Sequence, residues 1–308
     1  MTFNVFAVDE WQAYAEEQMG TKRKIWFRSP DGGMYLFKYP RPNSGEAWAE
    51  KVAAEIAEAI HIPHAEVELA MFQGEQGTIC KSFMTDPASD LFHGNQLLSI
   101  MHPGYDSKRN AGQVDHTYQR IMRIISALDT SAPHPCLTSD GVTCFAGYLT
   151  LDALIGNSDR HHENWALMLS FAREADGPML VASSTLAPSF DHASCLGREL
   201  SDDQRRGLLA DAQRLQYYFG RCRSRVYWDG EEQRQLHPIE LVRRGYTESP
   251  ELFEPWLDIS VTMDDNTVYS LLDSLPSDWM SDEAREFAAA LVRLNRSALE
   301  EVRKEAVT

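Results

Sequence analysis

The chain has 308 residues, which exceeds the usual size of one domain and indicates two lobes. Hydrophobic residues make up 43% of it and charged residues 24%, the composition of an ordinary globular protein with a sizeable core. The formal net charge is −17, which argues against non-specific binding to nucleic acid or to an anionic membrane.

No apolar run in the sequence reaches the roughly 18 residues that a membrane-spanning helix needs. The N-terminal stretch lacks the charged and apolar regions of a signal peptide. The five cysteines are scattered, without a closely spaced pair, which indicates reduced thiols. We therefore expect a cytoplasmic protein with no direct contact to nucleic acid or membrane.

The first elements in chain order are two strands and a helix. Residues 24–38 predict two strands around the Ser-Pro-Asp-Gly-Gly turn at 29–33. Residues 44–62 predict a helix that Ser44 caps. Its apolar stripe recurs every four residues and consists of Trp48, Val52, Ile56 and Ile60.

A second strand pair follows at residues 65–72 and 77–84, and completes a small strand-rich N-terminal lobe over residues 1–85. From residue 86 the pattern is mainly helical, which predicts a larger helical lobe over residues 86–308. Its predicted elements are helices at 117–129, 142–156 and 281–305 and strands at 164–171 and 178–186. The predicted fold class is α+β, with a small strand-rich lobe followed by a larger helical lobe.

The segment IGNSDRHHENWALML, residues 155–169, places a dense polar cluster between two apolar segments. Asp159 follows the predicted helix, Asn164 comes five residues later, and Asp191 follows the second strand. A carboxylate that accepts a proton, with an amide and a carboxylate that bind Mg²⁺, is the set that phosphoryl transfer requires. The Asp-to-Asn spacing is that of protein-kinase catalytic loops.

Kinase chemistry also needs a cation for the nucleotide phosphates, and Lys38 lies in a strand of the small lobe. A buried lysine requires an anionic partner, which the next helix offers at Glu46, Glu50 or Glu55. Glu46 and Glu50 lie one turn apart on the same face, whereas Glu55 points elsewhere. We favour Glu50, and Glu46 remains an alternative.

Lys38, Glu50, GNSDRHHEN (156–164) and PSFDHASCLG (188–197), in this order, resemble the HipA-like serine/threonine kinase family. The resemblance covers most of the chain, including FEPWLDIS and EFAAALVRLNRSAL near its end. It implies a kinase-like two-lobe fold that binds ATP and Mg²⁺.

Carried over to this sequence, the resemblance makes Asp159 the catalytic base, and Asn164 and Asp191 catalytic residues that hold magnesium. The nucleotide would contact the residues Lys38, Glu50, Lys81, Phe83 and His161. Two features depart from the family. The long N-terminal subdomain of the full-length toxins has no counterpart ahead of Lys38, so the resemblance is to short members, in which a partner supplies that module. A G-x-G-x-x-G loop is missing, and residues 29–33 are the candidate to cover the phosphates.

The expected activity is that of an ATP- and Mg-dependent protein kinase with a Ser/Thr acceptor in a protein substrate. By resemblance alone, it would be the toxin of a toxin–antitoxin system with an antitoxin partner. The alternatives are a small-molecule or lipid kinase, because Asp-Arg-His-x-x-Asn also resembles the phosphatidylinositol kinase loop, and a nucleotide-binding interaction module. The charge of −17 argues against a lipid substrate.

Two further features have open interpretations. Ser29 is either a simple turn residue or a site of autophosphorylation, as in some relatives, where a phosphate would compete with ATP for Lys38. Arg221, Arg223 and Arg225 form either a solvated or internally paired face or a docking site for an acidic or phosphorylated substrate.

Overall fold

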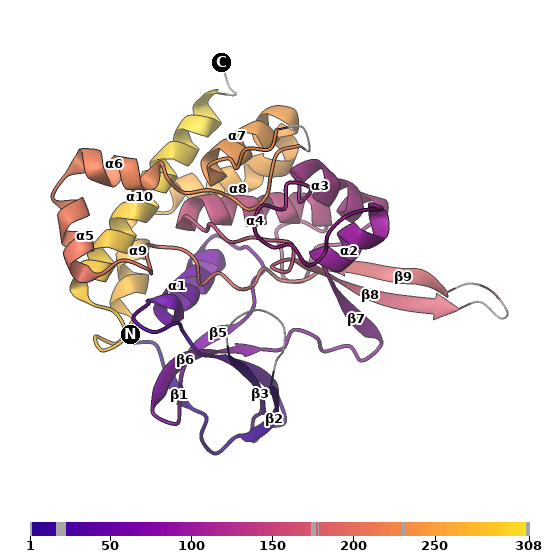
Figure 1. Ribbon diagram of the computed structural model, residues 1–308, viewed down its shortest axis with the longest axis horizontal. Coiled ribbons are helices and arrows are strands. Elements are labelled where there is room, and N and C mark those ends of the chain that lie inside the picture. The colour runs from indigo at the N-terminus through magenta and orange to yellow at the C-terminus, as the bar shows by residue number, and fades with distance from the viewer. Residues whose placement is uncertain (1, 17–22, 174–176, 178, 230–231, 306–308) are drawn as a thin grey trace.

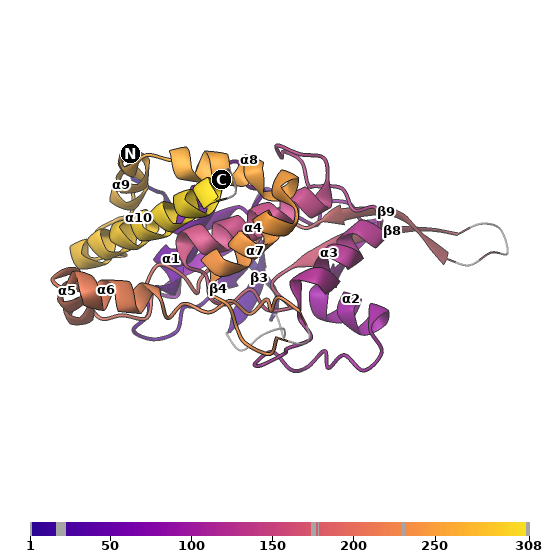
Figure 2. The same cartoon turned by 90° about the horizontal axis from the view of Figure 1, so that it is seen from above.

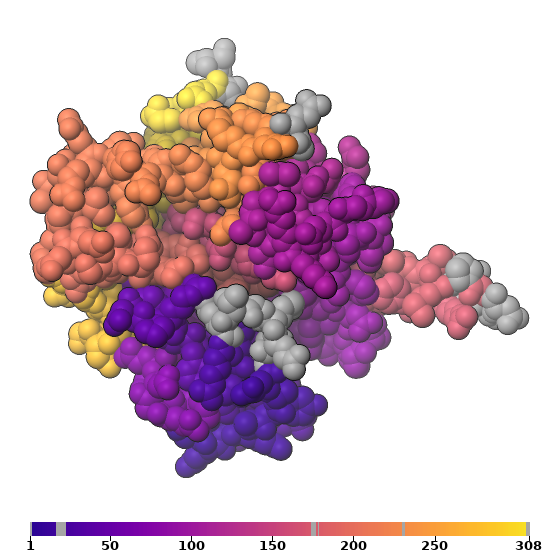
Figure 3. Space-filling model, viewed as in Figure 1, coloured from indigo at the N-terminus to yellow at the C-terminus, as the bar shows by residue number. Residues whose placement is uncertain are grey.

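The computed structural model describes residues 2–16, 23–173, 177, 179–229 and 232–305. A strand-rich N-terminal lobe lies below a larger helical lobe (Figure 1). In the space-filling view the N-terminal lobe is the indigo part, and a hairpin of the larger lobe projects from the side (Figure 3). The predicted two-lobed α+β fold is confirmed.

The N-terminal lobe is built on a six-stranded sheet of order β1-β5-β6-β4-β3-β2. Its elements are β1 (Val5–Ala7), β2 (Gln12–Glu16), β3 (Lys24–Arg28), β4 (Met34–Lys38), α1 (Glu46–Ala59), β5 (Val67–Phe72) and β6 (Glu75–Lys81). Both predicted strand pairs are present as antiparallel neighbours. We did not predict β1 and β2, which are short and exposed along their whole length and therefore have no apolar alternation.

The helix α1 carries three residues of the predicted apolar stripe, the fourth, Ile60, is its C-cap, and all four are buried. The predicted cap is wrong, because α1 begins at Glu46 with Gly45 as its N-cap. The Ser44 hydroxyl instead donates to the Arg41 carbonyl at 2.8 Å, in the turn before the helix. A Cβ on Gly45 would lie 2.2 Å from the Trp48 indole, so the close approach of that ring requires glycine.

The C-terminal lobe contains β7 (Ser89–His93), α2 (Gly94–Met101), α3 (Tyr118–Ala127), α4 (Gly141–Ile155), β8 (Ala166–Arg173), β9 (Met179–Leu186), α5 (Asp202–Leu209), α6 (Ala212–Phe219), α7 (Pro238–Glu248), α8 (Pro250–Thr262), α9 (Asp265–Asp273) and α10 (Asp282–Glu305). Almost every residue of α4 is buried, because α3, α7, α8 and α10 all pack against it. Figure 2 shows α4 at the centre of this helical layer. No helix within the described ranges is long and apolar enough to cross a bilayer.

A second sheet of order β7-β8-β9 belongs to the C-terminal lobe, and its β8–β9 hairpin projects beyond the body (Figure 1). Sequence analysis missed β7, which is held by pairing with β8 more than 70 residues later. The first sheet ends at Lys81 and the second begins at Ser89, on either side of the lobe boundary expected at residue 85.

The order of α4, β8 and β9 determines where the polar cluster lies. Helix α4 ends at Gly156, whose φ of 65° is the left-handed conformation of a helix C-terminus. The chain then forms a loop over residues 156–164, which we call the Asp159 loop, and enters β8. Strand β9 leads to Asp191, whose backbone also has a positive φ of 60°. The two segments thus meet at the base of the N-terminal lobe.

Candidate active site

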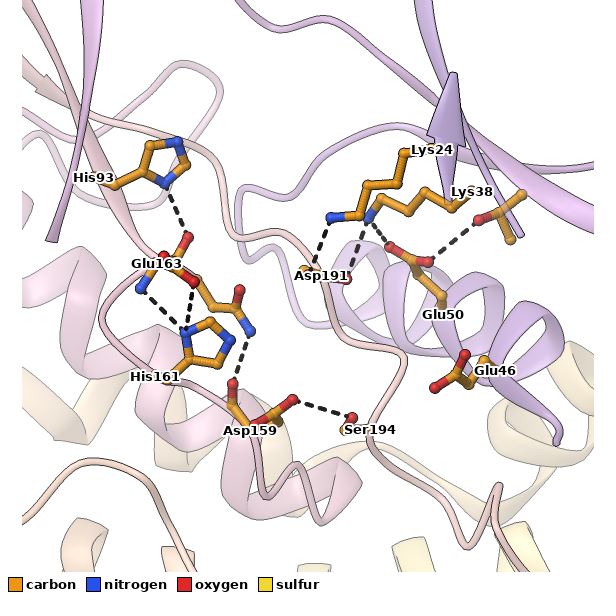
Figure 4. Close-up of polar contacts among 12 residues, drawn as sticks. Lys24, Lys38, Glu46, Glu50, His93, Asp159, His161, Glu163, Asp191 and Ser194 are labelled. Carbon is orange, nitrogen blue, oxygen red and sulfur yellow. Dashed lines mark hydrogen bonds and ion pairs between the residues drawn. The ribbon is translucent and has the colours of Figure 1, made fainter. Parts of the chain in front are cut away.

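A cavity of about 370 Å³ lies between the two lobes. Its wall includes the predicted site residues Lys38, Lys81, Phe83, Asp159, His161, Asn164 and Asp191. These residues come from β4, β6 and the residues that follow it, the Asp159 loop and the segment after β9, and Figure 4 shows how several of them face one another. Residues up to 153 positions apart in the sequence therefore share one site.

Glu50 lies behind this wall and contacts Lys38. The Lys38 ammonium donates to Glu50 Oε1 at 2.5 Å, and both side chains are almost fully buried. Thr78 donates its hydroxyl to Glu50 Oε2 at 3.2 Å and so orients the carboxylate. Glu46 points elsewhere and pairs with Arg41 and Arg198 at 2.7 and 3.0 Å. Of the two glutamates that the sequence left open, Glu50 is the one that contacts Lys38.

Lys38 also approaches Asp191, with 3.3 Å between Nζ and Oδ1. Burial by itself lowers the pKa of Lys38, but the carboxylates of Asp191 and Glu50 more than offset this and raise the pKa above its ordinary value. Lys38 is therefore a permanent cation at the wall of the cavity. Lys24 adds a second ammonium, 3.9 Å from Asp191 Oδ2.

A buried arginine holds the Asp159 loop in place. Arg160 forms a two-pronged ion pair with Asp152 of α4, in which Nη2 lies 2.8 Å from Oδ1 and Nε contacts Oδ2. The same guanidinium donates to the Asn164 carbonyl at 3.0 Å and to the Ser189 hydroxyl at 2.9 Å. Arg160 thus joins α4, the loop and the segment before Asp191.

The loop presents the Asp159 carboxylate to the cavity, with about a third of the side chain exposed. The Asp159 N–H donates to Asn157 Oδ1 at 3.1 Å, and its carbonyl accepts from Asn164 Nδ2 at 2.7 Å. The carboxylate itself contacts Ser194 Oγ and Arg225 Nε, each at 3.5 Å. These contacts fix the loop around Asp159 and leave the carboxylate accessible.

Asn164 and Asp191 have the donor atoms that suit Mg²⁺. Because the Asn164 amide nitrogen is used by the Asp159 carbonyl, the side-chain oxygen remains available to a cation. Asp191 supplies a carboxylate on the same cavity wall. No group of three His, Cys, Asp or Glu side chains suited to a metal occurs among the described residues. Mg²⁺ commonly takes one or two protein oxygens and completes its shell with water and phosphate oxygens, so the pair fits this ion.

The adjacent histidines point to different surroundings. His161 lies on the cavity wall and its Nδ1 accepts the Glu163 N–H at 3.2 Å. His162 is buried in the lobe, where Tyr105 hydrogen-bonds to its Nδ1 at 2.6 Å. Burial lowers the pKa of His162 to about 4, so this imidazole is neutral at pH 7.

The other end of the cavity is apolar. Its wall there is formed by Trp26, Leu36, Phe83, Met84, Leu91 and Phe190. The rings of Phe83 and Phe190 lie 5.8 Å apart, whereas Lys81 is at the rim, where its ammonium lies 3.2 Å from Glu66. This end is suited to a flat, largely apolar ring such as a nucleobase.

Sequence analysis missed Lys24, Trp26 and Leu36, although a signal for them existed. In the β3–β4 pair, Lys24 is opposite Lys38 and Trp26 is opposite Leu36. Side chains two residues apart on a strand share a face, so the alternation of β3 places Lys24 and Trp26 on the face of Lys38. The contacts of Ser194 and Arg225 with Asp159 had no comparable local signal.

Ser29 lies in the β3–β4 turn, where its side chain is almost fully buried. Its hydroxyl contacts Asp31 Oδ1 and donates to the Gly33 carbonyl at 3.1 Å. Phosphorylation of Ser29 stays a prediction, and it would require this turn to open.

Comparisons with known proteins show what the chain is similar to in sequence and in fold. The sequence pattern of the family described as "HipA-like C-terminal domain" matches residues 15–223. The chain is 21% identical to the serine/threonine-protein kinase CtkA of Helicobacter pylori (strain J99) over 296 residues, which cover 92% of this chain and 81% of that protein.

Two solved structures share the fold. The crystal structure of the proinflammatory kinase CtkA from Helicobacter pylori aligns with a TM-score of 0.73 and 19% identity, over 99% of both chains. A structure of the HipA, HipB and operator DNA complex from the toxin–antitoxin system of Shewanella oneidensis MR-1 aligns with a TM-score of 0.54 and 11% identity, over 96% of this chain and 68% of that one. Since the matched pattern spans more than half of the sequence, this chain belongs to the HipA-like C-terminal domain family.

Proposed function

We propose that the chain is a MgATP-dependent protein kinase that transfers the γ-phosphoryl group of ATP to a serine or threonine hydroxyl. The observation that carries the proposal is the convergence of the buried Lys38–Glu50 pair with Asp159, Asn164 and Asp191 at one cavity between the lobes. Membership of the HipA-like family, and a relative named as a serine/threonine-protein kinase, support it.

The two ends of the cavity suit the two parts of a nucleotide. The apolar end, between Trp26 and Phe190, would take the adenine ring. Lys38 and Lys24 would meet the phosphates at the other end, where Asp191 now lies 3.3 Å from one ammonium and 3.9 Å from the other. Glu50 holds the Lys38 side chain extended toward that end.

Asp159 is the group positioned to handle the acceptor proton. Its carboxylate would accept the proton of the hydroxyl as the hydroxyl oxygen bonds to the γ-phosphorus. The bond from that phosphorus to the bridging oxygen breaks, and ADP leaves with the electron pair. Asn157 and Asn164 hold the Asp159 backbone on both sides, so the carboxylate needs little rearrangement.

Asn164 and Asp191 would hold Mg²⁺ through side-chain oxygens. The ion, when bound, neutralises charge on the phosphate oxygens and so favours transfer. Asp191 would then exchange part of its contact with Lys38 and Lys24 for the cation, which frees both ammonium groups for the nucleotide.

The test is the intact mass of wild-type protein and of the Asp159→Asn variant after incubation with MgATP, with and without a host-cell lysate. We expect phosphate on the wild-type chain or on a lysate protein, and none with the variant. Asp273→Asn, an exposed carboxylate at the end of α9, is the matched control and should behave as wild type. Transfer by Asp159→Asn at the wild-type rate would contradict the assignment, and transfer only to small molecules would favour a small-molecule kinase.

A partner of the HipB kind belongs to the same proposal. The structural likeness is to a HipA that was solved with HipB and operator DNA, so an antitoxin-like protein is the first partner to test. Co-purification of tagged chain with proteins encoded beside it should recover such a partner. Recovery of the chain by itself at native expression would count against it.

A further inference from the structure

A second cavity, of about 600 Å³, adjoins the nucleotide cavity at Ser194 and includes Arg225, which contacts Asp159. It is lined by the end of the α4 segment, the chain after Asp191, and the segment that follows α6. Ser194 lines both cavities, and its hydroxyl lies 3.5 Å from Asp159 Oδ2, as Figure 4 shows. The second cavity therefore opens beside the carboxylate that would accept the acceptor proton.

Three arginines line this cavity, at alternate positions of the segment after α6: Arg221, Arg223 and Arg225. Arg225 reaches Asp159, with 3.5 Å between Nε and Oδ1. Arg221 packs 5.8 Å from the centre of the Tyr217 ring, and Arg223 donates to the carbonyls of Gly220 and Cys222, each at 2.7 Å. All three arginines thus belong to the lining of this cavity.

Arg221 and Arg223 form no ion pair with a carboxylate of the described residues. Several other arginines of the C-terminal lobe do, for example Arg243 with Glu240 at 2.7 Å and Arg293 with Asp265 at 2.9 Å. Within the described part of the chain, Glu199 is the one acidic residue of the cavity wall, and it accepts a hydrogen bond from Tyr218 at 2.6 Å. The wall therefore has an excess of positive charge in a chain whose net charge is −17.

We infer that this second cavity is the acceptor site, and that it selects serine or threonine residues flanked by acidic side chains. The inference rests on the proposed function and gives it a substrate class. When the acceptor hydroxyl of a substrate lies within reach of Asp159, the substrate residues that flank it lie beside Ser194 and Arg225, in the second cavity. Guanidinium groups pair with carboxylates through two parallel hydrogen bonds, whereas a lysine or arginine in the peptide would be repelled.

The net negative charge of the chain works against an acidic preference, so it cannot be the source of one. At long range the protein repels an acidic peptide and attracts a basic one, so an acidic preference must come from groups at the site. Arg221 and Arg223 supply those groups without another carboxylate to neutralise them. If these arginines were only a solvated surface, there would be no reason for them to line a cavity that adjoins Asp159.

The experiment is transfer of phosphate from MgATP to a peptide library with a central serine or threonine. Each flanking position is fixed in turn as aspartate, alanine or lysine, and kcat and KM are measured for the best acceptors. For wild type we expect aspartate-flanked peptides to be preferred. The Arg221→Ala/Arg223→Ala variant should lose about 10-fold in kcat/KM for these peptides, mainly as a higher KM, because the lost contacts bind substrate and transition state alike.

Arg214→Ala is the matched control. It removes one arginine from the exposed surface of the adjacent helix α6 and is not part of the cavity wall. Its kcat/KM should stay within about two-fold of wild type, because an exposed charge outside the site contributes little. An equal loss in this control would overturn the inference, since the effect would then come from net charge.

Arg223 also binds two backbone carbonyls, so its removal also takes two contacts from the loop. The Arg221→Glu/Arg223→Glu variant separates the two effects. Both double variants lose the contacts of Arg223 with the loop carbonyls. If the arginines select acidic neighbours, the glutamate variant should prefer lysine-flanked peptides more strongly than the Arg221→Ala/Arg223→Ala variant does, whereas a loop effect would be equal in the two.

The outcomes for the proposed function and for the inference can be told apart. Transfer to library peptides without an acidic preference, or an acidic preference that both double variants retain, overturns the acceptor-site inference and leaves the kinase proposal standing. Absence of transfer from wild type to every peptide and to every lysate protein overturns both.

Discussion

Lys38 Nζ lies 2.5 Å from Glu50 Oε1 and 3.3 Å from Asp191 Oδ1, so one ammonium joins a strand and a helix of the N-terminal lobe to a loop of the C-terminal lobe. The buried pair sets the direction of the lysine, and the contact with Asp191 ties it to the end of the cavity where we propose that the phosphates bind. The arrangement of the site thus depends on how the two lobes sit together.

Replacing Glu50 with glutamine should lower the catalytic efficiency with ATP and have a smaller effect on the stability of the fold. The glutamine side chain keeps the shape of Glu50 and its contact with Thr78, and Lys38 retains Asp191 as a partner. We expect kcat/KM for ATP to fall about 30-fold, equivalent to about 2 kcal/mol, because Lys38 is no longer held extended. Steady-state kinetics with varied ATP would measure this.

Glu46→Gln is the matched control, one turn earlier on α1. Glu46 pairs with Arg41 and Arg198 and is not part of the cavity wall. This variant should lower the melting temperature and leave the KM for ATP close to wild type. If the two variants changed the KM for ATP equally, the Lys38–Glu50 pair would have no special role.

Replacing Asp191 with asparagine should raise the Mg²⁺ concentration needed for phosphate transfer. The change removes the charged ligand of the proposed Asn164–Asp191 pair, and a hard divalent cation prefers a carboxylate to an amide. We expect the midpoint of a Mg²⁺ titration to rise at least about 10-fold, the equivalent of about 1.4 kcal/mol. An unchanged midpoint would show that Asp191 is not a magnesium ligand.

Removing Arg160 should destabilise the protein. Its ion pair with Asp152 is almost fully buried, so Arg160→Met leaves a carboxylate in the core without its partner. Breaking a buried pair in this way costs about 3–5 kcal/mol of unfolding free energy. Urea denaturation followed by tryptophan fluorescence measures it.

The double variant Arg160→Met/Asp152→Leu tests whether the unpaired carboxylate of Asp152 causes this loss of stability. It removes both charges, so it should recover a large part of the stability that Arg160→Met loses. Activity should stay low in both variants, since the Asn164 carbonyl and Ser189 lose their donor. A double variant no more stable than the single one would indicate that the loss comes from packing.

Stability should fall as the pH is lowered below about 6.5, in part because of His116. This imidazole is buried, its Nε2 accepts from Trp165 Nε1 at 3.0 Å, and its Nδ1 bonds to the Arg225 carbonyl at 3.0 Å. Burial lowers the pKa of His116 to about 3. Between that value and the unfolded value near 6.5, the unfolded chain binds the extra proton, so acid favours unfolding.

The measurement is the unfolding free energy at pH 7, 6 and 5 for wild type and His116→Gln. Each such histidine adds up to about 1.4 kcal/mol per pH unit to the slope, so the variant should show a shallower dependence by up to that amount. Above pH 7 the term vanishes, and any difference there reflects the lost contacts with Trp165 and Arg225. Parallel curves at all three pH values would rule out His116 as a source of the acid sensitivity.

Two strand pairs, four helices and the local set of polar groups could be predicted from the sequence. Alternation and turn residues predicted the β3–β4 and β5–β6 pairs, and spacing predicted α1, α3, α4 and α10. These features are encoded by neighbours within a few residues, which is why they can be read without a structure. The positions of Asp159, Asn164 and Asp191 around two strands likewise follow from local order along the chain.

The contact partners of the site residues could not be predicted from the sequence. It separated Glu50 from Glu46, because one faces Lys38 in the sheet and the other faces Arg198 of the C-terminal lobe. The short strands β1 and β7 exist because distant strands complete their hydrogen bonds, and the Arg225–Asp159 contact joins positions 66 residues apart. Such contacts arise when the packed core brings distant segments together, and no pattern of neighbouring residues specifies them.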